Sequence, residues 1–271
     1  MKPKQMAIGY SFLVRPDDIP VSVDTCRAIA ASGVHCLELA ITDWPDDRHD
    51  PMTALLTQSA QNVRAGGLQV WSCHIPFGTT WDISDPLVAS DAVRRMRAVL
   101  DVCEALGIPI AVVHASYEPI REARAQRLAQ CAQSLRALAR PGIRLAVETL
   151  PRTCLGNRSE ELLSLLSDIP YVDACVDVNH SHQEYAVKTL RTLKDRLLTL
   201  HISDDDGLDE KHWYPGEGVR EWAYILHTLE EIDYTGAFMY EVGVRPDGHP
   251  EYITQNFQKL LQLYAERFER P

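Results

Sequence analysis

The sequence has few basic residues, and it lacks the long apolar runs that mark membrane and secreted proteins. Among 271 residues there are 27 Lys and Arg but 38 Asp and Glu, which gives a formal net charge of -11. An acidic surface repels phosphate backbones, so the composition disfavours a nucleic-acid partner. The longest apolar stretch, GIPIAVVHA, is too short to cross a bilayer, and MKPKQMAIGYSF does not resemble a secretory signal. We therefore expect no membrane association.

Cysteine pairs and nucleotide-binding motifs are also missing. The seven cysteines are odd in number and form no CxxC pair. This usage predicts reduced thiols in a cytoplasmic protein, most of them acting as small buried apolar residues. No GxGxxG follows the first predicted strand and no Walker loop occurs, which weakens a nucleotide-binding interpretation.

What the sequence does contain is a regular alternation of short apolar runs with amphipathic helical patterns. Eight β-then-α units in a chain of this length predict an α/β fold, a single (β/α)8 TIM barrel whose one domain covers residues 1–271. The rival is an open doubly wound sheet. The predicted strands are 5–11, 35–40, 68–74, 109–116, 143–149, 173–179, 197–203 and 237–243.

Acidic and imidazole side chains stand near the ends of seven predicted strands, where the active site of a TIM barrel lies. Each one alone could be an arginine-paired carboxylate, a turn cap or a buried histidine. Together at one barrel mouth they would repel one another and stay desolvated, which predicts a divalent cation among them. The residues are Glu38, His74, His114, Glu148, Asp177, His201 and Glu241, with His180 three positions after the aspartate.

Four of these side chains are suited to a single metal ion, because they come from four consecutive strands that lie about 4.8 Å apart. Three carboxylates and one imidazole suit Mn²⁺, Mg²⁺, Co²⁺ or Zn²⁺ better than a thiolate-selective metal. We predict one divalent ion, with Mn²⁺ as the first choice, and open positions for substrate. The four predicted ligands are Glu148, Asp177, His201 and Glu241.

Five segments carry a family resemblance: HIPFGTTWDIS (74–84), AVETLP (146–151), CVDVNHSH (175–182), HISDDDGLDEKHWYPGEG (201–218) and YEVG (240–243). They resemble the xylose isomerase-like TIM barrels, a superfamily that includes sugar isomerases, sugar epimerases and endonuclease IV. The resemblance covers nearly the whole chain. It implies that the four strand-end residues named above are the metal ligands and that His180 contacts substrate.

The resemblance also implies a reaction, which is isomerisation or epimerisation of a sugar, a sugar phosphate or a keto acid. Proton transfer next to a carbonyl would pass through a metal-stabilised enediolate, with Glu148 and Glu241 as the catalytic carboxylates. The partner would be a small carbohydrate-like substrate, and family habit implies a dimer or tetramer. Further substrate contacts are predicted from His74, His114, His180, His212, Glu38 and Trp81.

Departures from the family pattern keep other reactions open. Ketose 3-epimerases that resemble this chain carry an arginine where Gly207 stands and a second glutamate where Cys154 stands. A metal-dependent lyase or dehydratase on the same barrel therefore remains an alternative. A binding barrel without catalysis is a third possibility, but it would be expected to have lost its ligands.

An endonuclease IV-type phosphodiesterase with three zinc ions is the remaining alternative. Its extra metal sites would use His74 and His114 on one side, and His180, Glu210 and His212 on the other. The residue sequence of the segment DDDGLDEKHWYPGEG resembles the sugar isomerase branch, and the negative net charge also favours that branch over endonuclease IV.

The segment 204–218 is expected to be a loop that covers the mouth of the site. Gly216 and Gly218 permit a tight turn before the next helix, and His212 would project towards substrate or a further metal. Five cations near predicted loops could bind a phosphate or a carboxylate, although solvated surface charge explains each of them more simply. They are Arg15, Arg152, Arg158, Lys211 and Arg245.

Overall fold

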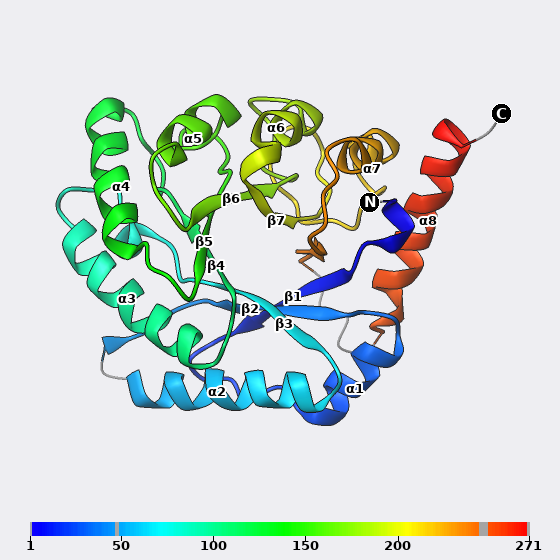
Figure 1. The fold of residues 1–271 in the computed structure, drawn as a ribbon, viewed down its shortest axis with the longest axis horizontal. Helices are drawn as coiled ribbons and strands as arrows, with labels where there is room; N and C mark the ends of the chain where they lie inside the picture. The colour runs from blue at the N-terminus through cyan, green and yellow to red at the C-terminus, as the bar shows by residue number, and fades with distance from the viewer. Residues whose placement is uncertain (1, 47–48, 244–248, 270–271) are drawn as a thin grey trace.

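The computed structural model describes residues 2–46, 49–243 and 249–269, and over these ranges strands and helices alternate along the chain. Figure 1 shows the strands at the centre and the helices around them in chain order. The strands are β1 (Ile8–Val14), β2 (Cys36–Ile41), β3 (Gln69–His74), β4 (Ile110–His114), β5 (Arg144–Glu148), β6 (Val172–Asp177), β7 (Leu197–His201) and β8 (Phe238–Tyr240).

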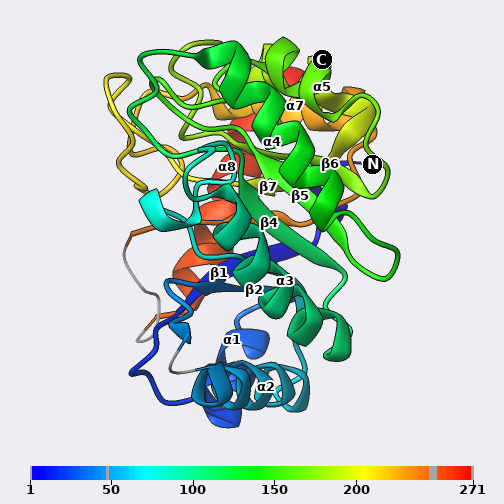
Figure 2. The same cartoon turned by 90° about the vertical axis from the view of Figure 1, so that its left-hand side faces the viewer.

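The helices cover the outside of the sheet, and Figure 2 places α3 and α4 in front of the strands after a turn of 90°. They are α1 (Val23–Ala31), α2 (His49–Ala65), α3 (Ala89–Ala105), α4 (Arg124–Leu138), α5 (Ser159–Leu166), α6 (Ala186–Leu193), α7 (Trp222–Glu231) and α8 (Glu251–Phe268). None of the described helices combines the length and the apolar composition needed to cross a bilayer.

The sheet closes into a barrel. Neighbouring strands pair in parallel in the order β7-β6-β5-β4-β3-β2-β1-β8, and the two ends of this order meet at Ile202. The backbone N–H of Ile202 donates to the carbonyl of Met239 at 2.8 Å, and its carbonyl accepts from Glu241 at 3.0 Å. The predicted (β/α)8 TIM barrel is therefore confirmed.

Apolar residues on the inner faces of the helices build the core between helices and barrel. In α8, for example, Ile253, Phe257, Leu260 and Tyr264 recur at intervals of three or four residues and are buried. Strands β2 and β6 are buried along their whole length, as expected for parallel strands covered by helices. All seven cysteines are buried and free, as the sequence predicted.

Two register shifts decide which side chains face each other inside the barrel. Leu37 pairs with Val70, but the next residue, Glu38, pairs with Ser72, so Trp71 is an extra residue in β3. A similar shift lies between β6 and β7. Irregularities of this kind re-aim the side chains that follow them.

The observed strands differ from the predicted bounds by up to three residues at one or both ends, and the differences in the first two strands are described here. The first strand begins at Ile8 and runs to Val14 instead of spanning 5–11, because Pro3–Gln5 form a short 3₁₀ turn, η1, before it. The second strand continues to Ile41. Glu38 was predicted near the end of this strand, but it lies within it and therefore deeper in the barrel.

Candidate metal centre

The four predicted ligands meet at the mouth of the barrel. Glu148 and Asp177 are the last residues of β5 and β6, His201 is the last residue of β7, and Glu241 directly follows β8. Asp177 and His201 are also register partners in neighbouring strands. One ligand atom from each of the four lies within 4.8 Å of the others. The structure thus brings together the set that the sequence singled out.

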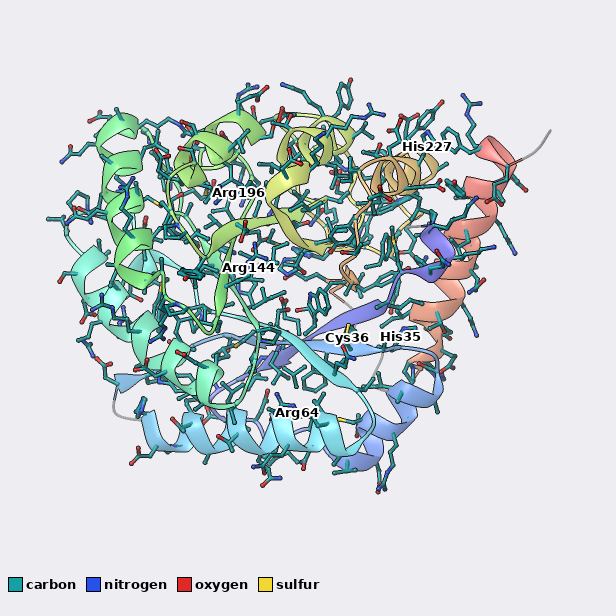
Figure 3. The ribbon with its side chains drawn as sticks, in the orientation of Figure 1. His35, Cys36, Arg64, Arg144, Arg196 and His227 are labelled. Carbon is teal, nitrogen blue, oxygen red and sulfur yellow. The ribbon has the colours of Figure 1, made fainter. Side chains whose placement is uncertain are left out.

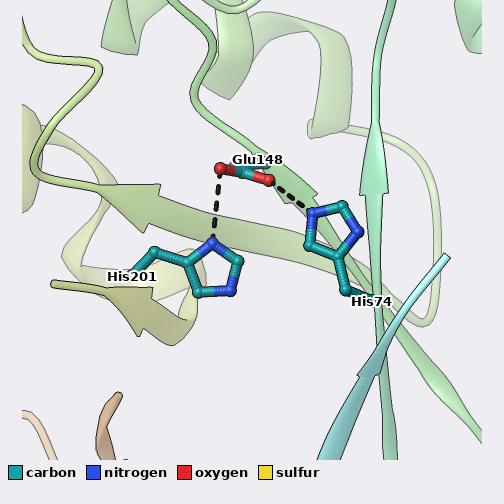
Figure 4. A group of neighbouring side chains, drawn as sticks. All are labelled: His74, Glu148 and His201. Carbon is teal, nitrogen blue, oxygen red and sulfur yellow. Dashed lines mark hydrogen bonds and ion pairs between the residues drawn. The ribbon is translucent and has the colours of Figure 1, made fainter. Parts of the chain in front are cut away.

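Glu148 is the centre of this group and is almost completely buried. Its Oε2 atom lies 3.0 Å from Nε2 of His74 and 3.0 Å from Nε2 of His114. Its Oε1 atom lies 3.3 Å from Nδ1 of both His201 and His180. Figure 4 shows the carboxylate between the rings of His74 and His201. Burial raises the pKa of Glu148, but the imidazoles outweigh this and hold the pKa well below its usual range.

Among the described residues, Asp177 has a buried oxygen atom without a hydrogen-bond partner. Its Oδ1 atom accepts from the backbone N–H of Asn179 at 2.7 Å. Its Oδ2 atom has no hydrogen bond within the part of the chain that the structure describes, although Nδ1 of His180 lies 3.2 Å away. Burial raises the pKa of Asp177 to about 7; His180 opposes this rise and Glu241 adds to it. A buried carboxylate oxygen is rarely left unpaired in a protein, so this atom is the one that a cation would satisfy.

His201 is fully buried between two groups of carboxylates. Its Nε2 atom lies 3.0 Å from Oε1 of Glu38, and its Nδ1 atom lies 3.3 Å from carboxylate oxygens of Glu148 and Glu241. Burial lowers the pKa of this imidazole, but the acidic groups around it, Cys175 and Glu241 first, raise the pKa well above its ordinary value. The ring therefore faces negative charge on both of its nitrogen atoms.

A second cluster adjoins the first. His180, Glu210 and His212 each offer one ligand atom within 4.8 Å of the others. The Nε2 atom of His180 lies 2.9 Å from Oε2 of Glu210, and its Nδ1 atom lies 2.8 Å from the carbonyl of Thr149. His180 lowers the pKa of Glu210 to about 2. His212 reaches back to the carbonyl of Glu241 through Nδ1 at 3.0 Å.

Residues of both clusters line a cavity of about 200 Å³: Glu148 and Glu241 from the first, and His180, Glu210 and His212 from the second. Asp177 and His201 are not among the described residues that line it. Phe77 forms one wall, stacked on His114 with the ring centres 4.3 Å apart. Burial lowers the pKa of His114. The side chains with titratable groups along the cavity are His74, His114, Tyr117, Glu118, Glu148, Arg152, Cys154, His180, Glu210, His212 and Glu241.

Two residues predicted to contact substrate lie elsewhere. Trp81 belongs to a 3₁₀ turn, η3 (Thr79–Trp81), where it is buried in the core with the guanidinium of Arg95 4.3 Å from its ring. Glu38 is fully buried behind His201. Neither is among the residues that line the cavity, because a turn and a register shift place their side chains behind its wall.

The loop after β7 is tied at its base by Asp204, to which sequence reasoning gave no role. The Oδ2 atom of Asp204 accepts from Gly216 N–H at 2.8 Å and from the indole N–H of Trp222 at 2.7 Å. Its backbone pairs with Trp213 in both directions. Gly216 has φ of 92°, and a Cβ atom on Gly218 would lie 2.1 Å from the carbonyl of Asp205, which confirms that the turn requires both glycines.

Arg152 is not simply a solvated surface charge. It lines the cavity, and its guanidinium bonds to Asp209 at 2.6 Å, to Glu210 at 2.9 Å and also to Glu118. The last partner belongs to the loop after β4, so Arg152 links three loops around the cavity. Its partners are distant in sequence, which is why the sequence did not reveal them. Arg245, named with it as a candidate anion-binding residue, lies outside the described residues.

Comparisons with known proteins agree with the fold. The family described as "Xylose isomerase-like TIM barrel" matches residues 26–263. An uncharacterized protein of Methanocaldococcus jannaschii is 25% identical over 187 residues, and the match covers 62% of this chain and 62% of that protein.

Solved structures of other proteins have a similar fold. A D-tagatose 3-epimerase-like protein superposes with a TM-score of 0.75 at 19% identity, covering 97% of this chain and 99% of that one. A 3-keto-D-glucoside 4-epimerase from E. coli gives a TM-score of 0.75 at 16% identity, covering 94% and 100%. At such low identities the likeness concerns the fold.

Proposed function

Because the chain belongs to the xylose isomerase-like TIM barrel family, we propose that it is a divalent-metal-dependent isomerase or epimerase of a keto sugar. The observation that carries the proposal is the convergence of three carboxylates and one imidazole at the mouth of the barrel, where two of the carboxylates, Glu148 and Glu241, line a small cavity. The structures with a similar fold include two named for epimerases of keto sugars, so the barrel can host this chemistry.

The donor set fits a divalent cation of the Mn²⁺, Mg²⁺, Co²⁺ or Zn²⁺ type, and the unpaired Oδ2 atom of Asp177 supports a site at that place. The residues that would hold the ion are Glu148, Asp177, His201 and Glu241. When bound, such an ion supplies positive charge that stabilises the negative charge developing on a substrate carbonyl oxygen.

Glu241 is the better placed of the two catalytic carboxylates for contact with substrate. Its side chain is 25% exposed and lines the cavity, whereas that of Glu148 is 1% exposed and has four imidazoles around it. In our proposal Glu241 removes the proton from the carbon next to the carbonyl. Glu148 takes up a proton from His74, whose Nε2 atom lies 3.0 Å from its Oε2 atom and whose pKa is raised by Glu148 against the effect of burial. It then passes this proton to the same carbon from its own side of the cavity, which gives the epimer, or to the adjacent carbon, which gives the isomer.

Other cavity residues would orient the substrate and exclude water. His212 lies beside Glu241 at the cavity wall, where its second ring nitrogen can form a hydrogen bond with a sugar hydroxyl group. His180 contacts Thr149 and Glu210, so it would donate to substrate only after releasing Glu210. Phe77 covers His114 and keeps water from that side. These contacts would hold the reacting carbon in reach of both carboxylates.

Exchange of substrate hydrogen with solvent tests the proposal. The purified protein is loaded with Mn²⁺, its metal content is measured, and D-tagatose, other ketohexoses and a 3-keto-glucoside are each incubated in D₂O. We expect about one ion per chain and loss of one C–H signal in the NMR spectrum of at least one sugar, with neither in an E148A/E241A variant. Bound metal without exchange of any of these sugars would contradict the proposed reaction.

The second cluster of metal-ligating groups favours one alternative, an endonuclease IV-type phosphodiesterase with three zinc ions. His180, Glu210 and His212 are close enough to share an ion, and His74 and His114 both touch Glu148. The net charge of -11 opposes binding to DNA. About three zinc ions per chain, together with cleavage of DNA at abasic sites, would favour this alternative. Loss of water from a keto sugar would instead indicate a lyase.

A further inference from the structure

Glu38 is a fully buried carboxylate that lies within β2 and outside the cavity. Burial of a charged carboxylate is costly unless the group is paired and hydrogen-bonded. It was predicted to contact substrate, but its side chain is directed across the barrel to His201, at the end of β7. Its position therefore needs a different explanation.

Two serine hydroxyl groups hold the Glu38 carboxylate in place. Ser11 donates to Oε1 at 2.8 Å, and Ser72 donates to Oε2 at 2.7 Å. Ser11 and Ser72 are the register partners of Glu38 in β1 and β3, so all three side chains lie at one level of the barrel. The register shift after Leu37 is what brings Ser72, and not Trp71, opposite Glu38. The carboxylate thus has one fixed orientation.

His201 presents Nε2 to both oxygens of this carboxylate, at 3.0 Å and 3.3 Å. Each oxygen of the carboxylate already accepts a hydrogen bond from a serine hydroxyl group, so Glu38 is also the acceptor in its contact with His201. The Nε2 atom must then carry a proton. The other nitrogen, Nδ1, faces Glu148 and Glu241 on the side of the candidate metal centre.

We propose that Glu38 is a positioning residue that keeps Nε2 of His201 protonated and so presents the lone pair of Nδ1 to the metal centre. This inference rests on the proposed function, because it assumes that the centre binds a cation. Groups that accept the second N–H of a metal-bound histidine typically contribute about 10- to 100-fold to metal affinity. Glu38 would act on the reaction only through His201.

The protonation of the His201 ring can be observed directly. Protein labelled with ¹⁵N in the histidine rings is loaded with Zn²⁺, which is diamagnetic, and the His201 signals are assigned by comparison with H201Q. We expect Nε2 to carry the proton and Nδ1 to be bound to zinc. Zinc bound through Nε2 would overturn the role of Glu38. A protein that binds no zinc would contradict the metal centre itself, and hence the proposed function.

Variants of Glu38 measure the size of the effect. E38L keeps a similar volume but offers no acceptor, so we expect the dissociation constant for Zn²⁺ to rise about 10- to 100-fold. E38Q retains an oxygen that can accept from Nε2, and it should recover most of this loss. An E38L protein with the zinc affinity of the wild type would overturn the proposal.

A matched control separates this effect from the general loss of a buried charge. Asp173 is also a buried carboxylate, but it lies at the start of β6 and bonds to Arg144 and Arg196. D173N should therefore leave zinc affinity unchanged. If E38L does not fold, the ring protonation of wild-type His201 still decides the question.

Discussion

The two ends of the barrel differ in the partners that they provide for buried carboxylates. At the N-terminal end, Asp173 accepts from the guanidinium groups of Arg144 at 2.9 Å and Arg196 at 3.1 Å, two cations labelled in Figure 3. At the mouth, Glu148 and Asp177 have imidazoles as their closest positive partners, and one oxygen of Asp177 has no hydrogen bond to any residue in the ranges 2–46, 49–243 and 249–269.

The difference shows which end is complete without a ligand. An arginine is charged at every physiological pH, so the charge of Asp173 is balanced inside the chain. Imidazoles are charged only when protonated, so the mouth must take up protons or a metal ion to balance its carboxylates. The N-terminal end is therefore built for stability and the mouth for binding. The predictions below test this division, beginning with the largest effect.

The largest effect is expected from removing a proton-transferring group at the mouth. E241Q keeps the size of the side chain but cannot accept a proton, so solvent exchange of the substrate hydrogen should fall by about 10²- to 10⁴-fold. D173N should retain the wild-type rate within about twofold, because Asp173 lies far from the cavity. Exchange in D₂O measures both. Equal losses in the two variants would mean that the comparison between the two ends is wrong.

Metal binding at the barrel mouth should raise the free energy of unfolding of the protein. At about 100 times the dissociation constant, Mn²⁺ should add about 2.7 kcal/mol to the free energy of unfolding. This corresponds to a rise in Tm of roughly 5–10 °C, which a chelator should reverse. D177N should show a much smaller rise, since it replaces a ligand, and D173N should respond like the wild type. A Tm that does not depend on metal would argue against the site.

A substitution at the N-terminal end of the barrel should lower the free energy of unfolding without changing metal binding. D173A leaves Arg196 partly buried without its carboxylate, whereas Arg144 is half exposed and can be solvated. We expect a loss of about 2 kcal/mol, below the value for a fully buried pair. Denaturant unfolding measures this loss, and zinc affinity should not change. A parallel loss of zinc affinity would show that the two ends are coupled.

Acid should weaken metal binding at the mouth. The pKa of Asp177 is raised to about 7 in the metal-free protein, so below pH 7 a cation must displace its proton. His201, whose pKa is also raised, adds to this competition. We expect Mn²⁺ affinity to fall at least about tenfold between pH 8 and pH 6, and to keep rising above pH 8 until His201 has lost its proton. Calorimetry in two buffers of different ionisation enthalpy should detect the released proton, and affinity independent of pH would contradict this assignment.

The smallest effect on stability is expected from Arg152, in the loops around the cavity. R152A removes the links to Asp209 and Glu210, but the guanidinium is more than a third exposed, so the loss should be about 1 kcal/mol or less. Proteolysis within residues 206–212 should become faster. R158A, on an exposed neighbouring arginine, serves as the control. Equal proteolysis in both variants would mean that Arg152 does not fasten the loop.

The sequence predicted the barrel and the convergence of four side chains at its mouth because both follow from local patterns. Apolar runs mark the strands, and parallel strands bring their ends to one mouth. It did not predict the depth of Glu38, since the register shift beside it has no signature in the residues themselves. It also missed the partners of Arg152, because these come from loops far apart in the chain. The single-domain organisation, the oligomeric state and the cytoplasmic location stay predictions.

The base of the loop after β7 makes this segment separable from the barrel. Asp204 joins Trp213, Gly216 and Trp222 at a closed neck, so residues 206–212 leave and re-enter the fold at nearly the same point. Insertions between two such tied ends cost little in loop entropy. New lengths and sequences can therefore be introduced between these ends to change substrate choice while the barrel is left intact, provided that Glu210 and His212, which contact His180 and Glu241, are kept.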